Sequence, residues 1–259
     1  MNLIRSALTP LRSSILCLLV ALLALGGEQA LSEEATLAVA SNFQPAMEEL
    51  QTIFERSTGH RLKVSYGATG QFYAQIELGA PYHMFLSADA VRPALLSSQS
   101  QTVSQPPRTY AIGKLALWSP DAASLTAATL AQSDFRFLAI ANADLAPYGA
   151  AGREVIDRLD MADVLQKRIV QGNNVGQAFV FVQTGNAELG FVALSQILSL
   201  PEPERGAHWL PPPELYTPIR QDAVLLERGA LNDAATDFFA FLFSDEARRV
   251  IERAGYAVP

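Results

Sequence analysis

Short apolar runs alternate with amphipathic segments along most of this chain. Four times, an apolar run ends in a cluster of small polar or glycine residues, and a helical pattern follows directly. The clusters are Ser41-Asn42-Phe43, Gly67-Ala68-Thr69-Gly70, Ala146-Pro147-Tyr148-Gly149 and Gly172-Asn173-Asn174-Val175-Gly176. A strand–turn–helix junction of this kind exposes the free N–H groups and the positive dipole end of a helix start. Four such starts in one cleft could surround a small oxyanion without any charged side chain.

The alternation predicts an α/β fold with two similar halves, each with a mostly parallel sheet flanked by helices. Apolar stripes with a 3.6-residue period indicate helices, and short apolar runs indicate buried strands. The expected strands are 36–40, 62–66, 84–87, 110–119, 137–141, 168–170, 189–194 and 219–226. The expected helices are 45–57, 71–78, 92–99, 125–131, 149–159, 175–184 and 233–253.

A proline-rich segment separates the last strand and helix from the rest of the pattern. Residues 201–218 hold six prolines, which predicts an irregular surface loop. If the late strand and helix pack on the first half, the chain crosses between two lobes twice. Two crossings make a hinge that can close on a ligand. The expected division is lobe 1 at 33–111 and 219–259, and lobe 2 at 112–218.

The first 32 residues have the pattern of a secretory signal peptide. Arg5 and Arg12 precede an apolar stretch from Ile15 to Leu25, and a small-residue cleavage site follows. The stretch is shorter than the ~20 residues that a membrane span needs, although an uncleaved anchor is the alternative. The only cysteine, Cys17, lies inside it. The mature chain would therefore use neither disulfides nor thiol chemistry.

Composition narrows the classes of function. The chain of 259 residues is 49% hydrophobic and 17% charged, which supports a sizeable core. Without residues 1–32 it keeps 17 basic and 25 acidic residues, and this net charge of −8 argues against nucleic acid as a partner. No dinucleotide fingerprint, phosphate-binding loop or nucleophile elbow occurs. The histidines, His60, His83 and His208, lack the spacing of metal ligands.

The residues at the four junctions have a structural and a functional interpretation. Ser41, Asn42 and Thr69 are of types that commonly cap helices, and they could also bind a ligand. Tyr148 stands at an expected helix start, where capping needs no aromatic residue. Its phenol could donate into a cleft, or its ring could pack on the surface. Val175 can contribute only its backbone N–H.

Taken together, these motifs resemble those of a known family. The resemblance rests on Ala38-Val39-Ala40-Ser41-Asn42-Phe43, Ser65-Tyr66-Gly67-Ala68-Thr69-Gly70-Gln71, Phe85-Leu86-Ser87-Ala88-Asp89, Ala146-Pro147-Tyr148-Gly149, Asn174-Val175-Gly176 and Glu188-Leu189-Gly190-Phe191-Val192. In this order they are similar to segments of the periplasmic molybdate-binding proteins of bacterial ABC importers, across essentially the whole mature chain. The resemblance implies a two-lobed type II periplasmic binding protein, a monomer without cofactor or catalysis. It would deliver molybdate, and tungstate, to a membrane permease.

The resemblance also implies a ligand set. By position, the residues that match the family's ligands are Ser41, Asn42, Thr69, Tyr148 and Val175. Many members place a further tyrosine ligand where this chain has Ala193. This chain resembles the relatives that carry a tyrosine in the Ala-Pro-Tyr-Gly segment instead. A second departure is His83, where many relatives have an acidic residue.

Three classes of function stay open at this point. Molybdate and tungstate carry no proton at neutral pH, so every contact in their site can be a donor, and the implied shell contains no carboxylate. Sulfate or thiosulfate is the second possibility, because sulfate is also a pure acceptor. An exported enzyme on a related fold is the third. Such an enzyme would need acid–base groups in the cleft, for which His83 and Asp89 are the candidates.

Overall fold

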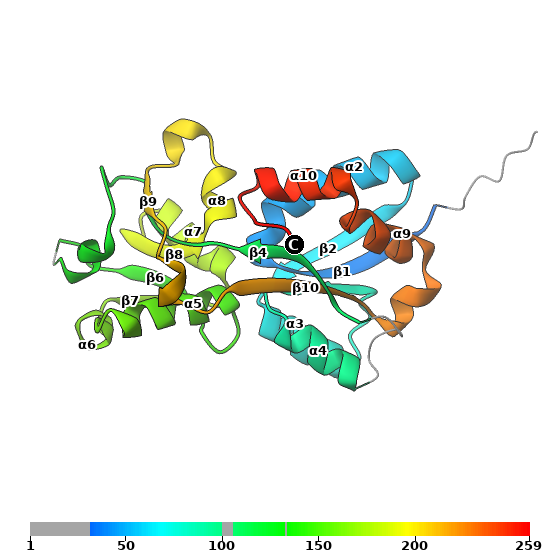
Figure 1. Ribbon diagram of the computed structural model, residues 1–259, viewed down its shortest axis with the longest axis horizontal. Helices are drawn as coiled ribbons and strands as arrows, with labels where there is room; N and C mark the ends of the chain where they lie inside the picture. The colour runs from blue at the N-terminus through cyan, green and yellow to red at the C-terminus, as the bar shows by residue number, and fades with distance from the viewer. Residues whose placement is uncertain (1–31, 100–105, 133) are drawn as a thin grey trace, which may run out of the picture. The chain divides into compact units, whose positions relative to one another are not determined.

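Within the described residues, 32–99, 106–132 and 134–259, the strands of this computed structural model form two five-stranded sheets (Figure 1). The predicted signal peptide lies outside the described residues apart from Ser32. In the described part of the chain, no helix is long and apolar enough to cross a membrane.

The first sheet has the strand order β2-β1-β3-β10-β4. Its strands are β1 (Glu34–Ala40), β2 (Arg61–Gly67), β3 (Met84–Leu86), β4 (Arg108–Gly113) and β10 (Ile219–Leu225). β1 runs parallel to both β2 and β3, whereas β10 runs antiparallel to β3 and β4. The late strand therefore returns to the first sheet and lies between two earlier strands.

The second sheet has the order β7-β6-β8-β5-β9. Its strands are β5 (Leu115–Ser119), β6 (Leu138–Ala141), β7 (Ile169–Gly172), β8 (Leu189–Ala193) and β9 (Ala207–Trp209). β6 is parallel to β7 and β8, and β5 is antiparallel to β8 and β9. The predicted fold class is confirmed. In each sheet one strand, β10 or β5, runs antiparallel to its neighbours.

Helices cover both sheets. Those of the first sheet are α2 (Gln44–Thr58), α3 (Thr69–Glu77), α4 (Val91–Ser98), α9 (Asp233–Leu242) and α10 (Asp245–Arg253), and these elements are called the first half below. Those of the second sheet, the second half, are α5 (Pro147–Arg158), α6 (Ala162–Leu165), α7 (Val175–Gln183) and α8 (Leu194–Leu198). A 3-10 turn, η1 (Ser41–Phe43), joins β1 to α2. As predicted, α2 ends at Gly59, whose φ of 78° suits glycine.

The predicted strand 110–119 is wrong, because it is two strands in different sheets. β4 ends at Gly113 in the first sheet, and β5 begins at Leu115 in the second. The backbone carbonyl of Lys114, between them, accepts a hydrogen bond from Leu194 N at 3.0 Å. The continuous apolar pattern conceals this break, since both strands are buried.

Three further elements differ from the prediction. The region 201–218 is not wholly irregular, because β9 pairs with β5. The expected helix 125–131 is a 3-10 helix at Ala127–Ala131. The expected helix 233–253 is two helices, since the Ser244 side chain accepts a hydrogen bond from Ala247 N at 3.2 Å and caps α10.

The chain passes from one sheet to the other twice, between β4 and β5 and between β9 and β10. β4 and β10 are paired antiparallel, and Figure 1 shows them side by side. The two crossing strands therefore lie together at one edge of the first sheet. The lobe boundaries at 111 and 218, and a hinge motion about these strands, stay predictions.

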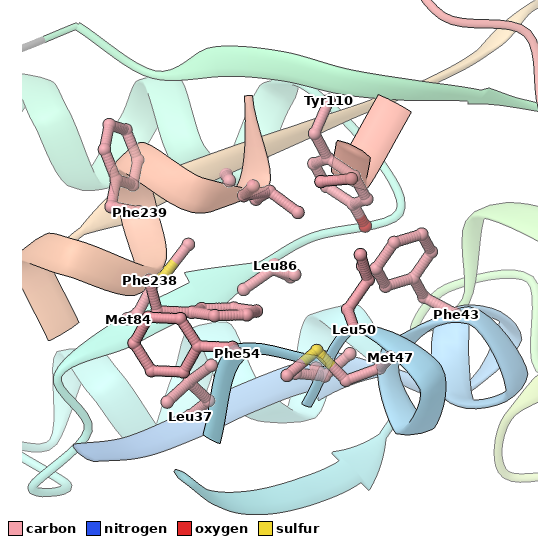
Figure 2. Close-up of a cluster of buried hydrophobic side chains, with 14 of the residues drawn as sticks. Leu37, Phe43, Met47, Leu50, Phe54, Met84, Leu86, Tyr110, Phe238 and Phe239 are labelled. Atoms are coloured by element: carbon pink, nitrogen blue, oxygen red, sulfur yellow. The ribbon is translucent and has the colours of Figure 1, made fainter. Parts of the chain in front are cut away.

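An aromatic core anchors the turn that follows β1 (Figure 2). The rings of Phe54 and Phe238 meet edge to face with centroids 5.2 Å apart. Phe43, at the end of η1, packs edge-on against Tyr110 at 4.8 Å and Tyr256 at 5.5 Å. Burying such a ring contributes roughly 1.5–3 kcal/mol. The position of η1 is thus set by core packing.

Two histidines hold the start of the first strand. His60 Nδ1 accepts a hydrogen bond from Glu33 N at 3.1 Å, and His83 Nδ1 accepts one from Thr36 N at 2.8 Å. Burial lowers the pKa of His83, and Arg228 lowers it further, against the opposing effect of Glu33. Because the neutral imidazole accepts this bond, protonation of Nδ1 would break it.

We expect His83 to make stability depend on pH. Its folded pKa lies below the ordinary value of 6.5, so the unfolded chain takes up a proton first as the pH falls. The free energy of unfolding should therefore fall as the pH decreases through that value and level off below the folded pKa. Urea unfolding at pH 7.5 and pH 5 measures the change.

The variant His83→Asn keeps a polar side chain that does not titrate, and its stability should depend less on pH over this range. The matched control is His208→Asn, at an exposed position on β9. An unchanged pH dependence in His83→Asn would contradict the assignment.

Candidate functional site

The four junctions meet at one small cavity. Its volume is about 10 Å³, far smaller than the pockets that hold organic ligands. It is lined by Ala40, Ser41, Asn42, Gly67, Ala68, Thr69, Ala88, Ala146, Pro147, Tyr148, Asn174 and Val175. All five residues of the predicted ligand set are among them, and none of the lining residues carries a charge.

Ser41 and Asn42 do not cap the helix that follows them. No side chain caps either η1 or α2. Instead, Ser41 Oγ accepts a hydrogen bond from Gly176 N of the second half at 3.2 Å. Asn42 Nδ2 donates to Gln221 Oε1 at 2.8 Å and to the Tyr256 hydroxyl at 3.0 Å. The capping interpretation is therefore wrong for both residues.

Thr69 is the first residue of α3, and its side chain does not cap that helix either. Thr69 Oγ1 accepts a hydrogen bond from Ala88 N at 3.0 Å, in the segment that follows β3. β1 and β2 both end at the cavity, and β3 ends beside it. These parallel strands therefore bring Ser41, Thr69 and Ala88 to the same edge of the sheet.

Tyr148 lies in the first turn of α5, and its side chain is buried. Its hydroxyl oxygen accepts a hydrogen bond from Gln221 Nε2 at 3.4 Å. Burial raises its pKa well above the ordinary range, and the neighbouring phenols of Tyr256, Tyr110 and Tyr216 add to that effect. Tyr148 is therefore protonated at neutral pH and can donate a hydrogen bond.

Val175 is the first residue of α7. Asn174 precedes it as the N-cap, and its side-chain oxygen accepts a hydrogen bond from Gln177 N at 3.0 Å. The N–H of a first helical residue has no partner within its own helix. The start of α7 therefore presents a backbone donor and the positive end of a helix dipole to the cavity.

The three hydroxyl groups share one arrangement. The oxygens of Ser41, Thr69 and Tyr148 each accept an N–H from the protein, so the proton of each hydroxyl is left to donate. Among the described residues, the buried Asn42 Oδ1 has no hydrogen-bond partner, but it belongs to an amide and not to a carboxylate. The arrangement suits a ligand that only accepts hydrogen bonds.

Several hydrogen bonds join the two halves around the cavity. Gly70 N donates to Leu145 O at 2.8 Å, and Arg92 Nη2 donates to Asp144 O at 2.9 Å. Ser195 Oγ of α8 donates to the backbone carbonyl of Asn42 at 3.0 Å. With the bond from Gly176 N to Ser41, these contacts connect the two halves around the cavity.

The two candidates for acid–base chemistry lie outside the cavity. His83 binds the backbone of β1. Asp89 forms an ion pair with Arg92 and lines a neighbouring groove of about 490 Å³. In the described part of the chain, no group of three or more His, Cys, Asp or Glu residues could hold a metal ion.

Sequence reasoning missed the residues behind the cavity. Gln221, Tyr256 and Ser195 are buried and hydrogen-bond to Asn42 or Tyr148. Each lies far from its partners along the chain, and none belongs to one of the junction motifs. Gln221 stands between Arg220 and Asp222, so the local sequence gives no sign that it is buried.

Comparisons with known proteins agree with this geometry. A family model described as bacterial extracellular solute-binding protein matches residues 35–257. The molybdate-binding protein ModA of Azotobacter vinelandii is 43% identical over 227 residues, covering 87% of this chain and 90% of that protein. The molybdate-binding protein ModA of Rhodobacter capsulatus is 42% identical over 224 residues, covering 86% and 88%.

Solved structures give the same picture. The periplasmic molybdate-binding protein of Azotobacter vinelandii aligns with a TM-score of 0.83 and 41% identity, over 87% of this chain and 99% of that one. The sulfate-binding protein SubI of Mycobacterium tuberculosis aligns with a TM-score of 0.69 over 87% of each chain. Its identity is 14%, so this likeness shows the fold alone.

We expect Gly113→Ala to disturb the cavity wall. A Cβ at Gly113 would overlap the Tyr148 hydroxyl oxygen and lie 2.8 Å from Gln221 Nε2. The free energy of unfolding should fall by about 1–3 kcal/mol, as for other overpacked sites. Adding Tyr148→Phe should restore part of that loss, because it removes the overlapped oxygen. Urea unfolding measures both changes.

The matched control is Gly152→Ala in α5. There a Cβ would meet the Phe191 side chain at 3.2 Å and no polar group, so the loss should be smaller. A Gly113→Ala protein as stable as the parent would show that the phenol lies elsewhere.

Proposed function

The chain belongs to the bacterial extracellular solute-binding proteins, and we propose that it captures molybdate in the periplasm and delivers it to the permease of an ABC importer. The observation that carries the proposal is the uncharged cavity, lined by hydroxyl and N–H donors. The relatives named as molybdate-binding proteins support this choice of oxyanion. Binding of an ion, and not catalysis, is the activity that this site suits.

The proposed ligand shell consists of donors from both halves. Ser41, Asn42 and Thr69 come from the first half, and Tyr148 and Val175 come from the second. The hydroxyls supply three donors, and the backbone N–H groups of Asn42 and Val175 supply two. Desolvating a dianion is costly, and each hydrogen bond to a charged group offsets roughly 1.5–3 kcal/mol. Several convergent donors are therefore required.

In the proposed cycle, the open protein binds molybdate on the first half. The second half then closes about β4 and β10 and adds Tyr148 and Val175. The hydrogen bonds between Gly176 and Ser41 and between Gly70 and Leu145 form in the same movement. The closed monomer docks on the permease and releases the anion there.

The proposal includes two expectations from the sequence. Residues 1–32 are removed as a signal peptide during export to the periplasm. Tungstate binds at the same site, because it is a tetrahedral dianion of nearly the same size and equally lacks a proton. Hydrogen phosphate should bind poorly, since its proton would find no carboxylate among the lining residues.

We expect molybdate and tungstate to stabilise the protein against heat, whereas phosphate should not. A ligand at one hundred times its Kd adds about 2.7 kcal/mol to the free energy of unfolding. For a chain of this size, that corresponds to a rise in Tm of about 5–10 °C. A thermal-shift panel with molybdate, tungstate, sulfate and phosphate measures it.

Thr69→Val serves as the site variant in this panel. It keeps the shape of Thr69 but removes the hydroxyl, so the rise in Tm with molybdate should shrink. Thr52→Val is the matched control, since Thr52 is exposed on α2 and its hydroxyl donates to Glu48 O. Stabilisation by sulfate but not by molybdate would sink the proposal.

A further inference from the structure

Gln221 links a crossing strand to the candidate site. It lies on β10 at the point where the register with β4 shifts, and its side chain is fully buried. Although no lining residue of the cavity comes from β10, Gln221 hydrogen-bonds to both Asn42 and Tyr148, one from each half. A buried amide in this position needs a partner for each of its polar atoms.

The neighbours of Gln221 determine how its amide is oriented. Its Oε1 accepts a hydrogen bond from Asn42 Nδ2 at 2.8 Å, and it shares the Tyr110 proton at 3.2 Å with the backbone carbonyl of Ser87 at 3.1 Å. Burial raises the pKa of Tyr110 well above the ordinary range, so this phenol keeps its proton. With the Asn42 amide donor on the Oε1 side, Nε2 faces the Tyr148 hydroxyl at 3.4 Å.

This orientation decides which way the Tyr148 proton can point. Because Nε2 donates to the phenol oxygen, the single phenolic proton must point away from Gln221. Within the protein, the neutral phenol of Tyr256 is a neighbour of the Tyr148 hydroxyl and helps to raise the pKa of Tyr148. An oxyanion in the cavity is a stronger acceptor than a neutral phenol, so it would draw the proton toward itself.

The other crossing strand, β4, also lies against the phenol. At Gly113, the last residue of β4, a side chain would overlap the Tyr148 hydroxyl and crowd Gln221 Nε2. The absence of a side chain at Gly113 therefore lets the phenol reach between the crossing strands. The two paired strands, β4 and β10, together determine where the Tyr148 hydroxyl lies.

We propose that Gln221 is a positioning residue that turns the Tyr148 hydroxyl into a hydrogen-bond donor for the oxyanion. Gln221 touches no ligand in this account and acts only through Tyr148. The inference rests on the proposed function, since it assigns the anion as the acceptor of the phenolic proton. It also gives the crossing strands a second role, since they position Tyr148 in addition to forming the predicted hinge.

A double-mutant cycle between Gln221→Met and Tyr148→Phe tests the proposal, with molybdate affinity measured by calorimetry at pH 7.5. Gln221→Met removes the Nε2 donor without adding charge, and Asn42 keeps Tyr256 as a partner. In the presence of Tyr148, we expect Gln221→Met to weaken binding about fivefold. Tyr148→Phe alone should weaken it about tenfold or more, because it removes a donor to a charged group. In the Tyr148→Phe background, Gln221→Met should change the affinity less than twofold.

A second variant, Gln221→Glu, tests the proposal even if Gln221→Met does not fold. Gln221→Glu keeps an acceptor for Asn42 but offers Tyr148 a carboxylate oxygen, which would capture the phenolic proton. Its loss of affinity should be larger with Tyr148 present than in the Tyr148→Phe background. Charge repulsion alone would weaken binding equally in both backgrounds, and that result would overturn the proposal.

The matched control is Gln51→Met. Gln51 is also a hydrogen-bonded glutamine of the first half, but its partners are Glu55 and Leu62 O, away from the cavity. It should leave molybdate affinity unchanged in both backgrounds. The Tm of each unliganded variant shows whether it folds.

The outcomes separate this inference from the function on which it rests. If the parent protein does not bind molybdate, the proposed function fails. If the parent binds, but Gln221→Met weakens binding equally with and without the Tyr148 hydroxyl, only the role of Gln221 fails. Equal affinity of Tyr148→Phe and the parent would also refute that role.

Discussion

The site depends on one constraint, namely that each hydroxyl of the cavity already accepts a hydrogen bond from the protein. Ser41 accepts from Gly176 N, Thr69 from Ala88 N and Tyr148 from Gln221 Nε2. A hydroxyl has only one proton, so occupying its oxygen in this way leaves it to act as a donor. With no charged residue in the lining, the cavity favours an ion that accepts from every direction and carries no proton. Molybdate has this character.

The fold places these groups by its topology. In the first sheet, parallel strands end at one edge, and η1 and α3 begin there. In the second half, α5 and α7 start at the same cavity. Core packing of Phe43 fixes the first turn, and hydrogen bonds between the halves connect them around the cavity. The paired crossing strands lie behind Tyr148, so the place where the halves could move is also the place where this proposed ligand residue is held.

The sequence predicted the groups that line the cavity better than the groups behind them. Local patterns reveal strand ends and helix starts, so Ser41, Thr69 and Tyr148 could be chosen from their motifs, and the family resemblance pointed to the same residues. The structure brings them together at one cavity. The break at Lys114 was not predictable, because two buried strands in succession look like one. Gln221 was missed for a related reason, since its partners lie in distant segments and no local pattern connects them.

The most direct test of the donor arrangement is a crystal structure of the protein with molybdate. The account predicts that the hydroxyls of Ser41, Thr69 and Tyr148 each lie within hydrogen-bonding distance of an oxygen of the anion. Each should also keep the N–H bond that it accepts from the protein. An anion bound instead beside Arg92 in the neighbouring groove, or one that contacts a carboxylate, would contradict the account.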